Sequence, residues 1–110
     1  MEKPLKGDII IIPFPFSDLS QTRRRPAFVV ANLTGEDIIL CQITSKKIQD
    51  SYSIKLLQNE FKQGTLKQES NIRPNKIFTA DRSIVEYTAG TIKPEKTKEI
   101  IEKICEIISE

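Results

Sequence analysis

Three consecutive arginines and a proline, Arg23-Arg24-Arg25-Pro26, carry the densest positive charge in the sequence. A strand-like run, Ala27 to Ala31, follows them directly, and a second apolar run, Ile38 to Cys41, leads into Gln42-Ile43-Thr44-Ser45. A turn signal at Thr34-Gly35 separates the two runs and predicts a hairpin, so the arginines and the hydroxyls meet at one edge. Guanidinium groups bind phosphate oxygens as rigid forks, and a hydroxyl adds a neutral donor. This edge therefore suits a phosphate-bearing ligand.

Short strands are expected to position these residues. The expected strands are Ile9–Ile12, Ala27–Ala31, Ile38–Cys41, Tyr52–Leu56, roughly Thr65–Ile72, Lys76–Thr79 and Glu86–Ile92. Pro13 and Pro15 cannot donate to a ladder, so the first strand should reach an edge or bend there and leave the core. Arg73-Pro74 should break a strand in the same way, and residues 59–64 are expected to form one helical turn.

Two polar segments, Ser17–Arg24 and Lys46–Ser51, are expected to be loops at the same edge as the arginines and hydroxyls. Phe14 and Phe16 precede the first loop. We expect them to be core or dimer contacts and not platforms for stacking, because nothing basic interleaves with them.

The end of the chain predicts a helix. Pro94 suits a first helical position, and isoleucines recur at spacings of three and four, at Ile100, Ile101, Ile104, Ile107 and Ile108. Short strands followed by one amphipathic helix predict a mostly β fold, a small bent barrel with a C-terminal α-helix packed on it. The length of 110 residues predicts a single domain over residues 1–110.

Charge and cysteine content narrow the function. The net charge is +2, and the segment from Pro94 to Glu110, with three lysines and five glutamates, is acidic, which implies a basic face elsewhere. The chain has no histidine, and Cys41 and Cys105 lack metal-like spacing, so we expect no metal or other cofactor and two buried, reduced thiols. No apolar run approaches the about 20 residues that span a bilayer, and no signal peptide is apparent, so we expect a cytoplasmic protein.

Six short motifs follow one another along the chain. They are Lys6-Gly7-Asp8-Ile9, Pro13-Phe14-Pro15-Phe16, Arg25-Pro26-Ala27, Gln42-Ile43-Thr44-Ser45, Ser70-Asn71-Ile72-Arg73 and Lys76-Ile77-Phe78-Thr79. In this order they resemble the MazF/PemK family of toxins from toxin–antitoxin pairs, over roughly Leu5 to Ile92. The resemblance implies an SH3-like barrel of the MazF/PemK/CcdB type, a homodimer, and a metal-independent endoribonuclease that cleaves mRNA. It also implies inhibition by a cognate antitoxin, which we expect to be acidic, and DNA binding together with that antitoxin.

The same resemblance assigns residues to the reaction. It places the catalytic arginine on Arg25, which directly precedes the proline, and the partner hydroxyl on Thr44. Cleavage by 2′-hydroxyl attack builds negative charge on the phosphate, and both groups can donate to it. A guanidinium is a poor base, so Arg25 is expected to stabilise charge, and the general base stays unassigned. The candidate RNA-binding residues are Arg23, Arg24, Gln42, Ser45, Lys46, Lys47, Ser70 and Arg73.

These features predict a sequence-selective endoribonuclease toxin that holds single-stranded RNA in a basic groove built by the loops Ser17–Arg24 and Lys46–Ser51. DNA should not be cleaved, because it lacks the 2′-hydroxyl. Two alternatives stay open. The first is a gyrase-poisoning toxin of the same fold, which would need neither Arg25 nor Thr44. The second is a non-catalytic RNA-binding barrel.

Overall fold

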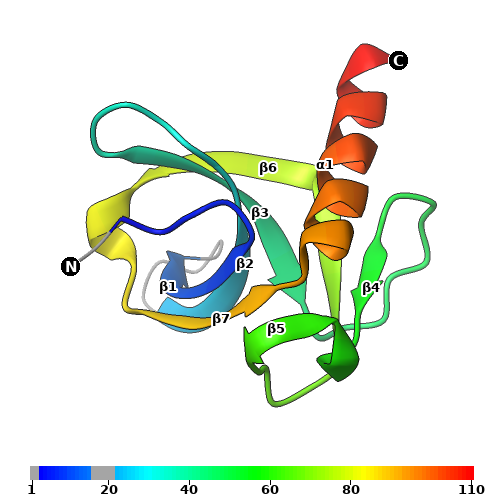
Figure 1. Cartoon of the computed structure of the whole chain (residues 1–110), viewed down its shortest axis with the longest axis horizontal. Coiled ribbons are helices and arrows are strands. Elements are labelled where there is room, and N and C mark those ends of the chain that lie inside the picture. The colour runs from blue at the N-terminus through cyan, green and yellow to red at the C-terminus, as the bar shows by residue number, and fades with distance from the viewer. Residues whose placement is uncertain (1–2, 16–21) are drawn as a thin grey trace.

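Antiparallel strands form one curled sheet, and a C-terminal helix packs against its side (Figure 1). The computed structural model describes residues 3–15 and 22–110, and within them the strand order is β4-β6-β3-β2-β1-β7-β5. The elements are β1 (Asp8–Pro15), β2 (Thr22–Asn32), β3 (Asp37–Thr44), β4 (Ile54–Leu56), η1 (Gln58–Glu60), β5 (Phe61–Gly64), β6 (Ser70–Asp81), η2 (Arg82–Ile84), β7 (Tyr87–Ile92) and α1 (Pro94–Ser109). The expected mostly β fold with one C-terminal helix is confirmed.

Alternation along the strands divides the apolar residues between two cores. Phe28 belongs to the helix-side core, whose buried members are Ile9, Phe28, Cys41, Ile43, Ile54, Leu56, Ile72, Ile92, Ile100 and Ile104. Its neighbours in β2 belong to the second core, which consists of Ile10, Ile12, Ala27, Val29, Ile38, Leu40 and Val85. Because successive side chains of a strand point to opposite faces, both faces of the central strands are buried. The central strands therefore contain long apolar runs, in which apolar residues do not alternate with polar ones.

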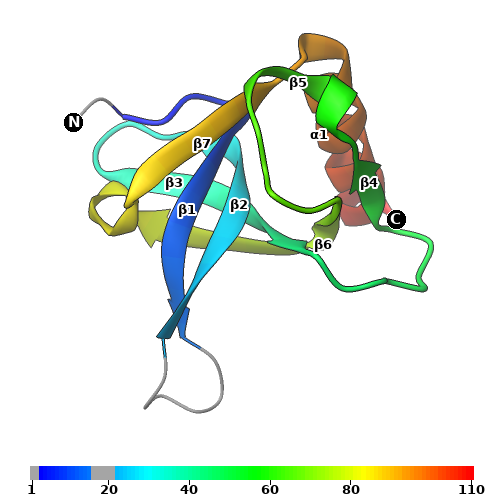
Figure 2. The same cartoon turned by 90° about the horizontal axis from the view of Figure 1, so that it is seen from below.

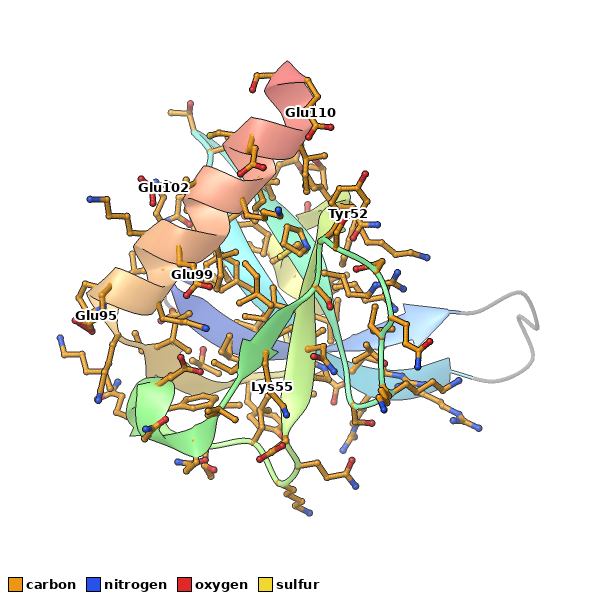
Figure 3. All side chains as sticks on the ribbon, turned by 90° about the vertical axis from the view of Figure 1, so that its right-hand side faces the viewer. Tyr52, Lys55, Glu95, Glu99, Glu102 and Glu110 are labelled. Carbon is orange, nitrogen blue, oxygen red and sulfur yellow. The ribbon has the colours of Figure 1, made fainter. Side chains whose placement is uncertain are left out.

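Helix α1 begins with Pro94 at its first turn, as predicted, and buries Ile100 and Ile104. The buried part of the isoleucine stripe is shorter than expected, since Ile108, near the end of the helix, is 68% exposed. Figure 3 shows Glu95, Glu99 and Glu102 along the outward side of the helix. No helix in residues 3–15 or 22–110 is long and apolar enough to cross a membrane.

The two cysteines have different environments. Cys41 is buried in the helix-side core, and loss of hydration raises the pKa of its thiol to about 12, so the thiol stays protonated. Cys105 is exposed, which contradicts the expectation of two buried thiols. It lies on α1 away from the stripe formed by Ile100 and Ile104.

Three expected strand boundaries are wrong. Strand β1 continues through Pro13 to Pro15, and β6 runs through Arg73-Pro74 without a break. A bulge explains the second case, because Cys41 pairs with Ile77 while the next residue pairs with Arg73, and the proline falls in the extra loop of chain. The strand expected over Thr65–Ile72 begins only at Ser70.

A strand, β5, occupies Phe61–Gly64, where one helical turn was expected. The turn lies just before it, at η1, where the Glu60 carboxylate accepts a hydrogen bond of 2.7 Å from the N–H of Leu57. The loop expected over Ser17–Arg24 is shorter at its end, since Thr22–Arg24 belong to β2. Its earlier part, and the predictions for the Phe14 and Phe16 side chains, lie outside the described structure.

Strands β1 and β2 project beyond the rest of the sheet as a two-stranded ribbon (Figure 2). β1 pairs with β7 only over Asp8–Ile11, whereas its pairing with β2 continues to Pro15 opposite Thr22. The edge predicted from the prolines is therefore present, although the strand does not end there. The arginine run lies in this ribbon, at the entry to β2.

A close backbone contact joins β5 and β7, where Gly64 pairs with Gly90. A Cβ atom on Gly64 would lie 2.2 Å from the carbonyl oxygen of Ala89, and the φ of Gly64 is +80°. We expect Gly64→Ala to lower the free energy of unfolding by about 2–5 kcal/mol, from left-handed strain plus the clash. Urea unfolding measures this change.

Gly35→Ala is the matched control, because Gly35 has a similar φ of +91° with no atom near the added Cβ. Gly35→Ala should lower the free energy of unfolding only by the left-handed strain, about 1–2 kcal/mol. Equal losses for the two variants would contradict the close contact between β5 and β7.

Candidate functional site

The register between β2 and β3 sets the arginine run against the hydroxyl-bearing end of β3. Ala27 pairs with Gln42. This is the last pair between the two strands, and continuing the antiparallel count beyond it would set Arg25 opposite Thr44 and Arg24 opposite Ser45. Directly opposite residues share a face of the sheet, so each pair has its side chains on the same side. The last pair thus lies two residues from Arg25 on β2 and two residues from Thr44 on β3.

A groove of about 650 Å³ lies beside this edge. It is lined by Ile11, Arg23, Arg24, Arg25, Pro26, Ile43, Ser45, Thr65, Leu66, Lys67, Gln68, Ser70, Tyr87, Thr88 and Ala89. Its floor includes apolar residues of the sheet, and the arginines gather at one side. Such a groove can hold a ligand that combines anionic groups with apolar, planar ones. Among the residues that the structure describes, no group of three or more His, Cys, Asp or Glu side chains is arranged to hold a metal ion.

The walls of the groove differ from those predicted. The segment 65–68 and strand β7 build one side, in place of the loop Lys46–Ser51. Lys46 and Lys47 are exposed and do not line the groove. Tyr87, which does line it, was missed by the sequence analysis, because nothing in its local sequence distinguishes it from an ordinary strand residue.

Arg24 is held at the groove by an ion pair. Its Nε lies 2.8 Å from Oε1 of Glu86, the residue just before β7. The Arg24 side chain is 73% exposed, so the pair is solvated and weak. An anion entering the groove can take over the guanidinium at little cost.

Thr44 does not line the groove, although its neighbours Ile43 and Ser45 do, because successive side chains of a strand point to opposite faces. The residue is 7% exposed, and its hydroxyl oxygen accepts a 3.1 Å hydrogen bond from the N–H of Lys46. Ser70, 5% exposed, lines the groove and donates to the carbonyl oxygen of Gln68 at 3.1 Å.

Gln42 and Arg73 pair with each other across β3 and β6 and do not line the groove. Arg73 contacts the Asp50 carboxylate at 3.3 Å, and its side chain is only 19% exposed. In this structure Arg73 therefore fastens the loop that follows β3. Asn71 adds a second tether, since its amide donates to the carbonyl oxygen of Lys46 at 3.0 Å.

Comparison with known proteins gives the family. The model of the "PemK-like, MazF-like toxin of type II toxin-antitoxin system" family matches residues 5–108, so the chain belongs to this family. No curated protein sequence matches it.

Solved structures share the fold. A MazE-MazF complex from Deinococcus radiodurans is 19% identical, with a TM-score of 0.79 over 99% of this chain and 98% of that chain. A mycobacterial endoribonuclease in complex with its cognate antitoxin is 13% identical, with a TM-score of 0.75 over 99% and 96%. The Mycobacterium tuberculosis toxin MazF-mt6 is 12% identical, with a TM-score of 0.69 over 93% and 96%.

Asp50 should make the tether of the 45–53 loop sensitive to acid. The pKa of Asp50 is lowered chiefly by the N–H of Ser53, with smaller contributions from Tyr52 and Arg73. Because the folded pKa lies below the unfolded one, Asp50 stabilises the fold above the unfolded pKa of about 3.9 and loses this effect as pH falls through the folded pKa.

Asp50→Asn should therefore lower the urea midpoint at pH 7, and the gap to the wild type should close at pH values below about 4. Urea titrations at a series of pH values measure the gap. A gap that persists unchanged at the lowest pH would show that the Asp50 charge does not stabilise the loop.

Proposed function

We propose that this chain is an endoribonuclease toxin that cleaves single-stranded RNA at selected sequences, with Arg25 and Thr44 acting on the scissile phosphate. The observation that carries the proposal is a groove lined by Arg25 and two further arginines, next to the stretch Ile43–Ser45 that contains Thr44. Membership of the MazF/PemK family and the endoribonuclease activity named for relatives of the same fold support it.

In the proposed reaction the ribose 2′-oxygen attacks the adjacent phosphorus. A bond forms between the 2′-oxygen and phosphorus, and the bond to the 5′-oxygen breaks, which yields a 2′,3′-cyclic phosphate and a 5′-hydroxyl. The 2′-hydroxyl proton leaves to a base that stays unassigned, and the 5′-oxygen takes up a proton. Arg25 and the Thr44 hydroxyl donate hydrogen bonds to the phosphate oxygens as charge develops on them.

The groove suits the rest of the RNA. Arg23 and Arg24 would bind neighbouring phosphates, while Ser45 and Ser70 add hydroxyl donors along the path. Lys46 and Lys47 lie outside the groove and would act by long-range attraction of the RNA. The apolar floor would contact bases, and the polar groups beside it would select the sequence.

We also propose a homodimer that binds an acidic, partly disordered antitoxin. Relatives of the same fold have been solved with MazE and with a cognate antitoxin. The arginine run offers the charge that an acidic segment would require, and the solvated Arg24–Glu86 pair can exchange its carboxylate for another.

Substitution of the catalytic pair tests the proposal. With a long single-stranded RNA and a chelator present, we expect cleavage at a few short sites, ending in a 2′,3′-cyclic phosphate. Arg25→Ala and Thr44→Ala should each lower kcat about 10²- to 10³-fold, because each removes one donor to the transition state. Thr44→Ser should keep much of the activity. Gel assays and mass spectrometry of the product ends provide the measurements.

Arg82→Ala is the matched control, since Arg82 pairs with Glu36 at the opposite end of β3 and should leave kcat unchanged. Wild-type activity in Arg25→Ala would refute the proposed site. Inhibition of gyrase supercoiling with RNA left intact would instead establish the gyrase-poisoning alternative. RNA that is bound but never cut would establish the non-catalytic barrel.

Antitoxin binding should compete with RNA. We expect a small acidic protein encoded next to this one to displace a labelled, uncleavable RNA from the groove. Fluorescence anisotropy of the RNA measures the displacement and its stoichiometry. Arg24→Ala should weaken both ligands, because both would use the same guanidinium. Formation of a ternary complex with RNA still bound would place the antitoxin elsewhere and contradict direct competition.

A further inference from the structure

Tyr87 is an exposed aromatic residue in a groove lined by arginines. Its residue surface is 55% exposed, and the other large hydrophobic residues exposed in the described part of the chain, Leu5, Leu33, Ile77 and Ile108, do not line the groove. An aromatic ring that is exposed to water beside cations is stabilised when a flat ligand covers it, because apolar surface is then removed from water. The position therefore calls for an explanation by ligand chemistry.

Strand register places Tyr87 at the end of an apolar row across the sheet. Tyr87 of β7 pairs with Ile11 of β1, and Ile11 pairs with Pro26 of β2. Extending the β2–β3 register sets Pro26 opposite Ile43. Cross-strand partners share a face of the sheet, and all four residues line the groove, so they form its apolar floor.

A polar row runs beside the apolar one. Arg24 lies two residues before Pro26 on β2, which places it on the same face about 6.6 Å along the strand. Ser45 lies opposite Arg24 in the extended register, and both line the groove. The face thus offers an apolar, aromatic row next to a cationic, hydroxyl-bearing row. A nucleotide has the same division, a flat base on one side of the ribose and a phosphate on the other.

We propose that Tyr87 is a base-binding residue of the groove, on which one unpaired base of the RNA stacks while Arg24 binds its phosphate. The inference rests on the proposed function and deepens it by naming a residue that contacts a base. Stacking requires an unstacked, single-stranded base, so the same residue favours single strands over duplex. Because every base has a flat face, Tyr87 provides affinity at one position and leaves sequence choice to neighbouring polar groups.

The test uses a short 2′-O-methyl RNA, which cannot be cleaved because its 2′-oxygen is blocked. Its binding therefore reports on Tyr87 even if the proposed catalytic pair proves wrong. Tyr87→Ala should weaken binding about 5- to 150-fold, as loss of one stacked base predicts. Tyr87→Phe should bind within about twofold of the wild type, because the ring carries the contact.

Salt dependence separates stacking from charge. Tyr87→Ala should leave the slope of log Kd against log salt concentration unchanged, whereas Arg24→Ala should reduce it by about 0.7. Ile108→Ala, which removes exposed apolar surface at the far end of α1, is the control and should bind as the wild type does.

Two further measurements test the contact between Tyr87 and a base directly. The chain has two tyrosines and no tryptophan, so in Tyr52→Phe the fluorescence comes from Tyr87 alone, and bound RNA should quench it. RNAs that carry one abasic site at successive positions should include one position at which wild type and Tyr87→Ala bind equally.

The inference would be overturned if Tyr87→Ala bound RNA with unchanged affinity, or if Tyr87→Phe and Tyr87→Ala lost equal RNA affinity. Absence of quenching by bound RNA would also overturn it. So would a Tyr87→Ala variant that alters the oligomeric state in light scattering while its RNA affinity stays at the wild-type value. That result would assign the exposed ring to contact with a second copy of the chain.

Discussion

The pairing of β2 with β3 is the constraint on which the site depends. In β2, Ala27 faces one core and Phe28 faces the other, so a slip of one residue would exchange the contents of both cores. Burial on both faces therefore fixes the register far more firmly than the polar ends of the strands could. The register of the strands that lead to Arg25 and to Thr44 thus follows from packing that lies outside the site.

Much of this arrangement could be predicted from the sequence. The hairpin around Thr34-Gly35 and the terminal helix depend on local signals, and the structure contains both. Arginines and the hydroxyls of Ser45 and Ser70 line one groove. The groove wall could not be predicted, because the segment 65–68 and Tyr87 reach the site through long-range pairing. The bulge at Arg73-Pro74 could likewise not be predicted from the sequence, because only the pairing with β3 shows that β6 accommodates extra residues there.

Polar residues near the site divide into those that build it and those left for a ligand. Asp50, Asn71 and Arg73 are occupied in fastening the loop after β3 to β6. Within residues 3–15 and 22–110 the ion pair of Arg24 is with Glu86 and is solvated, and Glu95, Glu99 and Glu102 of α1 lie on the outer side of the helix (Figure 3). Positive charge thus stays available at the groove in a chain whose net charge is only +2.

The prolines of β1 have a consequence for how molecules of this protein behave toward one another. Beyond Ile11 the outer edge of β1 has no neighbouring strand among the described residues, and an uncovered edge can recruit a strand from another molecule. Pro13 and Pro15 remove two N–H donors from this stretch. The ribbon can therefore carry its arginines into solvent with less risk of aggregation through continued sheet growth.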